Sequence, residues 1–269
     1  MKQWRNIELE IKGNRAYLQL NRPEVHNALN PALIHELGEA LKVISGMDET
    51  TFVILSGKGK SFCAGADIHW FASATEKTET ENQKEYLQLA ELFRELYLLP
   101  KITIAGVHGN VRGGANGLVA ACDFAVAEEN TAFAFGEIRL GIIPATIMPF
   151  IARRLSVQQM KKYMYSGEIF NGLEAMSIGL ADETAHSGQL MEKVNETVER
   201  MKYSPPEALN NCKQLITGIE NGEVSFKDGP YTSALLSRLI QSPEGREGLT
   251  AFREKRKPQW PNKKSKQQP

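Results

Sequence analysis

Three short apolar runs, at 52–55, 102–107 and 124–127, constrain most strongly what this chain folds into. Strands that are apolar at every position are buried on both faces, which is typical of a parallel sheet covered by helices. Before the first run, at 31–46, and between the first two, at 82–98, apolar residues recur at helical spacing. Strands that alternate with helices in this way predict an α/β fold with parallel strands.

The two ends of the chain differ from this central part. Alternating apolar residues on either side of Gly13-Asn14 predict an opening β-hairpin. After about residue 155 strand signals fade and helical spacing predominates up to 256, with Pro205-Pro206 as the best boundary. We therefore divide the chain into a core over 1–204, a helical region over 205–256 and a basic, mobile tail over 257–269.

Composition excludes several classes of protein. Thirty-two basic residues balance 32 acidic ones, so a globally basic surface for nucleic acid is excluded. No zinc-binding spacing of histidine or cysteine occurs, and we expect no metal site. The chain has no apolar run long enough for a membrane span and no secretory signal, and its three scattered cysteines suit a reducing compartment. We expect a soluble cytoplasmic protein.

Two glycine-rich segments are the first candidates for a functional site. Residues 61–68 follow the strand at 52–55, and residues 108–118 follow the strand at 102–107 and open a helix of small residues. A helix that starts after a glycine turn presents free N–H groups, which hold phosphates or a developing oxyanion. Glycines also serve close packing alone, and from these segments by themselves both interpretations stay open.

The third candidate is Glu137, the one acidic residue in the run 133–145, which is otherwise apolar except for Arg139. In a dry cleft, desolvation raises the pKa of a carboxyl group and suits it to acid–base chemistry. The alternative is a glutamate on a solvated loop that pairs with Arg139 or with backbone.

Together the three segments resemble the crotonase superfamily, also called the enoyl-CoA hydratase/isomerase family. The resemblance covers nearly the whole chain and is more specific for the fold than for the reaction. The motifs that carry it are Arg22-Pro23, Asn27-Ala28-Leu29-Asn30, 62–68, Gly113-Gly114, Ala121-Cys122-Asp123, 137–141 with Pro144, 179–182 and 252–257.

The resemblance implies a crotonase-type spiral of ββα turns, followed by helices at 205–256 that build a homotrimer or hexamer. It implies an acyl-CoA substrate, with coenzyme A as part of the substrate and no further cofactor. The backbone N–H groups of Ala66 and Gly114 would stabilise a thioester enolate, and Glu137 would be the acid or base. Residues implied to bind substrate or coenzyme A are His26, Ala28, Ala64, Asp67, Ile68 and Gly113, with Lys255 at the phosphates from the same or a neighbouring subunit.

The chain departs from the family pattern at Gly117, where typical hydratases carry a second glutamate. The runs 117–123, 137–145 and 163–168 are similar to bacterial methylglutaconyl-CoA hydratases, which also have glycine there. This resemblance implies hydration of 3-methylglutaconyl-CoA in leucine degradation, with isomerisation or decarboxylation as alternatives within the family. The second acid's task would fall to a substrate carboxylate, to a water held by Asn116, or to no group.

Arg112, beside the glycine pair, is our candidate partner for a distal carboxylate on the substrate. The alternative is a surface or subunit-contact arginine. From another class of function, a non-catalytic CoA-binding protein would also explain the missing acid. RNA binding would have to rest on residues 253–269, which hold seven basic residues against one acidic residue but only one aromatic, Trp260.

Overall fold

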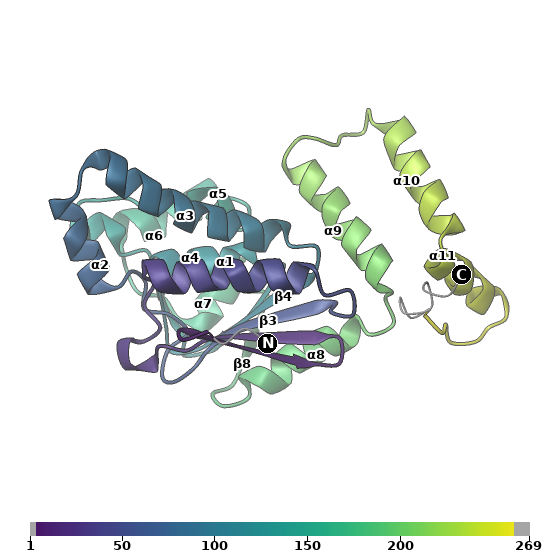
Figure 1. Ribbon diagram of the computed structural model, residues 1–269, viewed down its shortest axis with the longest axis horizontal. Helices are drawn as coiled ribbons and strands as arrows, with labels where there is room; N and C mark the ends of the chain where they lie inside the picture. The colour runs from purple at the N-terminus through teal and green to yellow at the C-terminus, as the bar shows by residue number, and fades with distance from the viewer. Residues whose placement is uncertain (1–3, 261–269) are drawn as a thin grey trace.

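A computed structural model describes residues 4–260 (Figure 1). Its centre is a six-stranded sheet in the order β1-β2-β3-β4-β6-β8, in which β1 and β2 are antiparallel and the other pairs are parallel. The predicted hairpin and all three predicted buried strands are present. The strands are β1 (Ile7–Lys12), β2 (Arg15–Leu20), β3 (Phe52–Gly57), β4 (Ile102–Val107), β6 (Phe124–Glu128) and β8 (Glu183–Ala185).

A second, smaller sheet includes part of the glycine-rich segment 108–118. It pairs β5 (Asn110–Arg112) with β7 (Ala132–Ala134) in parallel. Both strands have only three residues, too few for a periodic signal, and the sequence did not predict them. The 3-10 turns are η1 (Pro23–Val25), η2 (Ala74–Glu76) and η3 (Glu137–Leu140), the last of which begins three residues after the end of β7.

Helices cover both faces of the large sheet. Figure 1 shows α1 (Pro31–Ser45), α3 (Glu79–Leu98) and α4 (Gly114–Ala121) on one face and α8 (Leu190–Arg200) on the other. Side chains alternate accordingly: Val53 and Leu55 pack under the first group, whereas Phe52 and Ile54 pack against α8. The remaining helices are α2 (Ile68–Ser73), α5 (Met148–Ile151), α6 (Val157–Ser166), α7 (Gly172–Ser177), α9 (Pro206–Glu220), α10 (Gly229–Gln241) and α11 (Pro243–Arg253).

Capping explains where several helices begin and end. The Asn30 side chain accepts a hydrogen bond from Leu33 N at 2.8 Å and starts α1 as predicted. A capping box between Thr78 and Glu81 starts α3 three residues earlier than the apolar spacing indicated. The end of the region predicted to be helical holds two helices, because Ser242 caps α11 and Pro243 has no N–H to continue α10.

Helices α9, α10 and α11 extend from one side of the main body (Figure 1). The division at residue 204 and the oligomeric role of 205–256 stay predictions. At the start of the predicted tail, Gln259 N donates to Glu247 and the Trp260 indole donates to Tyr203 O at 3.0 Å. Residues 261–269 lie outside the described part of the chain.

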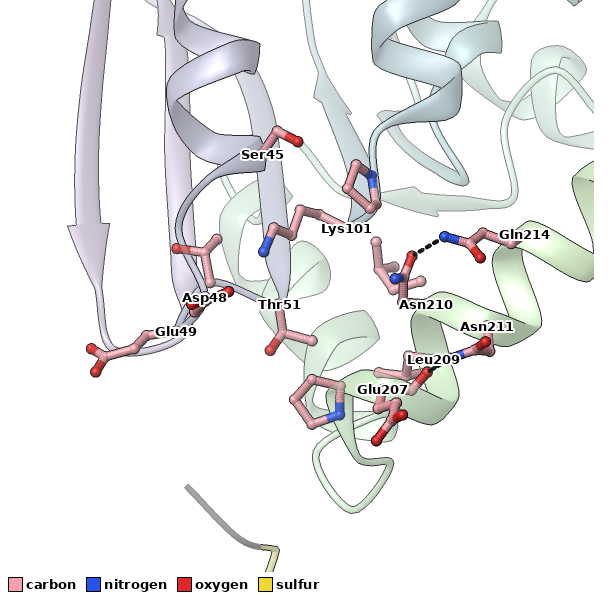
Figure 2. A pocket seen from close by; sticks show the side chains of 14 residues that line it. Ser45, Asp48, Glu49, Thr51, Lys101, Glu207, Leu209, Asn210, Asn211 and Gln214 are labelled. Atoms are coloured by element: carbon pink, nitrogen blue, oxygen red, sulfur yellow. Dashed lines mark hydrogen bonds between the residues drawn. The ribbon is translucent and has the colours of Figure 1, made fainter. Parts of the chain in front are cut away.

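A cavity of about 960 Å³ lies where α9 meets the main body. Figure 2 shows polar side chains around it, with Asn210 and Gln214 of α9 opposite Lys101 and Thr51. Thr51 and Lys101 precede β3 and β4, so this cavity lies at the amino ends of these parallel strands. Ligands of open parallel sheets bind beyond the carboxyl ends.

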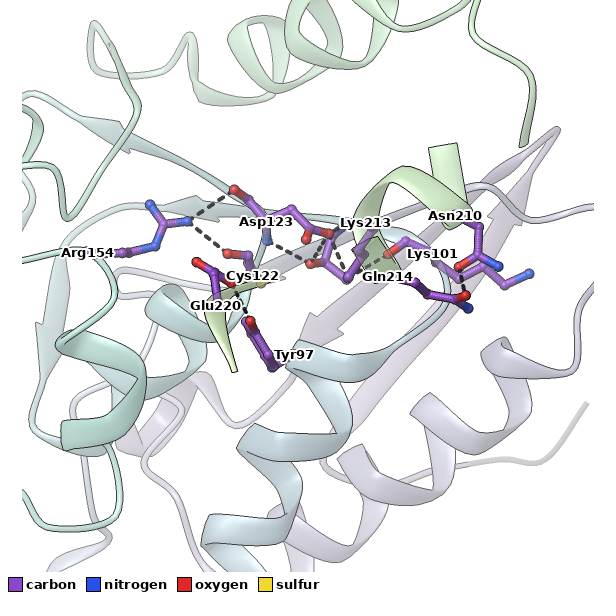
Figure 3. A network of polar contacts seen from close by, with 10 residues as sticks. Tyr97, Lys101, Cys122, Asp123, Arg154, Asn210, Lys213, Gln214 and Glu220 are labelled. Atoms are coloured by element: carbon purple, nitrogen blue, oxygen red, sulfur yellow. Dashed lines mark hydrogen bonds and ion pairs between the residues drawn. The ribbon is translucent and has the colours of Figure 1, made fainter. Parts of the chain in front are cut away.

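A buried ion pair joins α9 to the sheet (Figure 3). Lys213 Nζ of α9 is 2.8 Å from Asp123 Oδ2 and 2.9 Å from Lys101 O. The same Asp123 oxygen accepts from Thr103 N and Thr103 Oγ1, which ties β4 to the loop before β6. This network fixes the direction in which the C-terminal helices leave the body.

Within residues 4–260, none of the helices is both long enough and apolar enough to cross a membrane.

Candidate active site

The segment 63–67 lies between two other parts of the chain and brings the predicted site together. On one side Leu29 N donates to Gly65 O at 2.7 Å and Asp67 N donates to Leu29 O at 2.8 Å. On the other side Arg112 N donates to Cys63 O at 3.2 Å. These bonds place Ala66 near the end of β5, where Gly113 and Gly114 follow.

Both predicted backbone donors have N–H groups that local pairing leaves available. Ala66 faces Leu29 in a parallel bridge, and the two hydrogen bonds of this bridge are made by Gly65 and Asp67, the neighbours of Ala66. In such a bridge the N–H of the central residue points away from the facing strand, so the N–H of Ala66 points away from Leu29. Gly114 is the first residue of α4, so the helix supplies no partner for its N–H. Ala66 is exposed and Gly114 half-buried, so a ligand can reach both.

The turn before α4 requires glycine. Gly113 has φ +48° and ψ −121°, a conformation that side chains disfavour. A Cβ on Gly113 would lie 3.0 Å from Oε1 of Glu137, so the turn lies directly against the carboxyl group. The structure therefore brings Gly113, Gly114 and Glu137 together, as the sequence predicted.

The Glu137 carboxyl group is partly removed from solvent, which suits it to acid–base chemistry. It begins η3 and is half-buried, and its Oε2 is buried with no hydrogen-bond partner among residues 4–260. Burial raises the pKa of this carboxyl group, and the hydrogen bond from its own backbone N–H offsets only part of the rise. The neutral form is therefore favoured more than for an ordinary glutamate.

The position of the usual second glutamate is closed. A Cβ on Gly117 would lie 2.4 Å from Ile147 Cγ2 and 2.9 Å from Phe93 Cζ. Both side chains are almost completely buried, so neither has room to move aside. The sequence did not reveal that Phe93 and Ile147 pack against Gly117, because nothing in its pattern brings them to α4.

The residues predicted at the coenzyme A end lie on the loops that flank this segment. Ala64 N donates to His26 O at 2.9 Å, and His26 Nδ1 is 3.2 Å from Ser61 Oγ. Ala28 is buried one residue before Leu29, and Ile68 is 77% exposed at the start of α2. An apolar side chain this exposed is available for contact with a ligand.

Asp67 is held by protein groups. Its Oδ1 accepts from His69 N at 3.0 Å, which caps α2, and its Oδ2 is 2.9 Å from Arg22 Nη2. Although burial raises the pKa of this carboxyl group, the hydrogen bonds from Arg22 and His69 N outweigh it, and the pKa is lowered. The backbone is engaged too, because Asp67 N donates to Leu29 O and Asp67 O accepts from Phe71 N. The contact of Asp67 with coenzyme A stays a prediction. Arg22 thus links the loop that carries Asp67 to Ala28, because its guanidinium also donates to Ala28 O.

Arg112 and Lys255 differ in their distance from the site. Arg112 ends β5 directly before Gly113, and its guanidinium donates to Asn110 Oδ1 at 3.2 Å. Lys255 follows α11, which Figure 1 shows at the opposite end of the molecule from α2. The structure thus does not bring Lys255 to the site of its own chain, and a role there requires a neighbouring copy.

No metal centre accompanies this site, since no group of three or more His, Cys, Asp or Glu residues with the geometry to hold an ion occurs between residues 4 and 260. The cavity shown in Figure 2 contains none of the predicted site residues.

Comparison with known proteins decides the family. The model of the enoyl-CoA hydratase/isomerase family matches residues 10–263. The chain belongs to this family. It is 30% identical to the short-chain-enoyl-CoA hydratase of Clostridium acetobutylicum, with 94% of this chain and 96% of the relative aligned. It is 32% identical to the enoyl-CoA isomerase/hydratase fer4 of Mycosarcoma maydis, with 90% of each aligned.

Solved structures of the family share the fold. An enoyl-CoA hydratase from Shewanella pealeana superposes with a TM-score of 0.90 at 30% identity, covering 96% of this chain and 97% of the other. The predicted crotonase-type α/β fold is therefore confirmed. The comparisons support the hydration of enoyl-CoA at the level of the family.

The closed position at Gly117 predicts how two glycines in helix interiors respond to alanine. Gly117→Ala forces a methyl group against Ile147 and Phe93, and we expect a loss of about 1–2 kcal/mol in unfolding free energy despite the better helix propensity. Gly38→Ala, inside α1, meets only Glu95 Oε2 at 3.5 Å and should be neutral or stabilising by up to about 1 kcal/mol. Chemical denaturation measures both. Equal stability changes in the two variants would contradict a closed position.

The raised pKa of Glu137 predicts a stability difference that depends on pH. A carboxyl group whose pKa is higher in the folded state binds more protons there, so its contribution to stability is lost as pH rises through the folded pKa. Glu137→Gln should therefore be more stable than the wild type at neutral pH, with a difference that shrinks toward pH 4. Thermal denaturation from pH 4 to 8 measures it. A difference that is constant over this range would show that Glu137 titrates normally.

Proposed function

We propose that this enzyme adds water reversibly to an α,β-unsaturated acyl-CoA with Glu137 as its single catalytic carboxyl group. We further propose that the acyl group carries a distal carboxylate, as 3-methylglutaconyl-CoA does. Two features together carry the one-acid mechanism. Glu137 has a buried oxygen without a hydrogen-bond partner among residues 4–260, and Ile147 and Phe93 leave no room for a side chain at Gly117.

The two backbone donors would stabilise the charge that develops on the thioester oxygen. As water attacks Cβ, the double bond shifts toward the carbonyl and an enolate forms between the N–H groups of Ala66 and Gly114. Each such donor lowers the barrier by about 3 kcal/mol. Neither donor titrates, so this stabilisation is present at every pH at which the loops are folded.

Glu137 would donate and accept the protons that the addition of water transfers. In its neutral form, which burial favours, it gives its proton to Cα and leaves a carboxylate. That carboxylate accepts the proton that the attacking water loses when its oxygen bonds to Cβ. One water is added, and Glu137 returns to its starting state.

Arg112 supports the proposal of a carboxylated acyl group. Its guanidinium is half-buried, its hydrogen bonds go to the neutral groups Asn110 Oδ1 and Phe133 O, and desolvation lowers its pKa. No ion pair of this residue with a carboxylate occurs in the described part of the chain. A distal carboxylate would neutralise a charge that burial has made costly. The surface or subunit-contact interpretation of Arg112 stays the alternative.

Isomerisation is the second candidate. The relative from Mycosarcoma maydis is named for both reactions, and moving a proton between two carbons needs only one carboxylate. Decarboxylation would use the same enolate site. A non-catalytic CoA-binding protein would have the backbone donors but no need for a dry Glu137.

Three further predictions from the sequence are part of this proposal. The enzyme would act in the cytoplasm as a trimer or hexamer assembled through 205–256. Lys255 of a neighbouring copy would approach the coenzyme A phosphates. Apart from coenzyme A in the substrate, no cofactor or metal would take part.

The hydratase proposal predicts which product forms and which variant fails to make it. Pure enzyme with 3-methylglutaconyl-CoA or crotonyl-CoA should lose the absorbance of the conjugated thioester and yield a product heavier by one water. Glu137→Gln should lower kcat by roughly 10²–10⁴-fold, the range of a lost general acid. A product of unchanged mass would establish the isomerase instead, and no turnover in the wild type would support the binding protein.

The carboxylate proposal predicts a substrate-dependent effect of Arg112. Arg112→Met should raise KM for 3-methylglutaconyl-CoA by about 10-fold or more, the order of one charge-assisted contact, and leave KM for crotonyl-CoA within about 2-fold. Arg139→Met is a matched control, because Arg139 also lies near Glu137 but donates to Ser166 O. Equal losses for both substrates in Arg112→Met, or the selective loss in Arg139→Met, would refute the assignment.

A further inference from the structure

Asn116 lies on the first turn of α4 with no exposed surface. Its Nδ2 donates to Gly113 O at 3.1 Å and to Ala134 O at 3.0 Å. Ala134 O also accepts from Gly113 N at 3.0 Å. One buried side chain thus joins the glycine turn to the last residue of β7.

These bonds connect the two chemical parts of the site. Gly113 precedes Gly114, whose N–H is one of the two donors to the oxyanion. Ala134 is three residues before Glu137, and η3 starts directly after this stretch. The distance between the oxyanion donor and the acid therefore depends on how firmly the turn is held against β7.

Core packing alone does not account for an asparagine here. The other residues of α4 are Gly, Ala, Leu and Val, and an apolar side chain would suit this buried helix better. The Asn116 Oδ1 atom is itself buried without a hydrogen-bond partner among residues 4–260. A polar group that is buried at such a cost and uses both of its amide hydrogens on the active-site backbone has its effect there.

We propose that Asn116 is a positioning residue, which holds the Gly113–Gly114 turn at the correct separation from Glu137 for the reaction. It touches neither the thioester nor the reacting carbons, and acts through Gly113 O and Ala134 O. This inference rests on the proposed function, because the separation matters only if enolate and acid act on the same substrate.

The test uses a chromophore that reports on the oxyanion site independently of turnover. The absorption of 4-(dimethylamino)cinnamoyl-CoA shifts to longer wavelength when its thioester carbonyl is polarised by hydrogen bonds. Asn116→Leu keeps the branching at Cγ without the donors. Asn116→Ser is smaller, keeps one donor and covers the case in which the larger leucine side chain prevents folding. Thr197→Val is the matched control, since it removes a buried hydroxyl that donates to Lys193 O on α8.

In the wild type we expect the probe to bind with a red shift. In Asn116→Leu we expect binding within about 3-fold of wild type, loss of most of the shift, and hydration with kcat reduced at least 10-fold at similar KM. Asn116→Ser should lie between the two, and Thr197→Val should keep both the shift and kcat even where its stability falls.

Three results would overturn the account at different levels. An unchanged shift and kcat in both Asn116 variants would show that the turn is held without this side chain. Losses in Thr197→Val as large as those in Asn116→Leu would show a general effect of instability. A wild type that binds the probe without a shift would refute the oxyanion site, and with it the proposed function.

Discussion

The whole site depends on how closely the segment 63–67 approaches β5. Gly65 has φ +93°, and a Cβ there would lie 2.9 Å from Arg112 O, so only glycine lets the two backbones run side by side. This contact brings the N–H of Ala66 close to the start of α4. Any residue that separates the two segments would move one donor away from the other without touching substrate.

Much of this arrangement could be predicted from the sequence, because it depends on local signals. Apolar runs gave the buried strands and helical spacing over 31–46 gave α1, whereas the sequence left open whether Glu137 lies in a dry cleft or on a solvated loop. The three-residue strand β8 was missed because its pairing with β6, not apolar spacing, makes it a strand. The break at Ser242 was missed because a cap and a proline cause it, and apolar spacing does not show them. The closure at Gly117 could not be predicted, since Phe93 and Ile147 reach it only through tertiary packing. Lys255 shows the same limit, as its place depends on the direction of the C-terminal helices.

Two of the three buried side-chain oxygens without a partner in residues 4–260, Glu137 Oε2 and Asn116 Oδ1, lie where we propose that the chemistry takes place. Each lacks a partner within residues 4–260, and each belongs to a side chain at the Gly113 turn. Buried polar atoms without partners destabilise a fold by about 1–3 kcal/mol each, a cost that the apolar side chains buried around the sheet must offset. The same burial that costs stability raises the pKa of Glu137, which would suit it to the proposed role as an acid.

The most direct test of a one-carboxylate site is a crystal structure of the enzyme with a bound acyl-CoA. We predict the thioester oxygen within about 3 Å of both Ala66 N and Gly114 N, and the Glu137 carboxyl group beside Cα, with no other carboxylate of the protein within hydrogen-bonding distance of Cα or Cβ. A second carboxylate at these carbons, contributed by a neighbouring subunit or by a rearranged loop, would contradict the account. So would a thioester bound away from the two N–H groups.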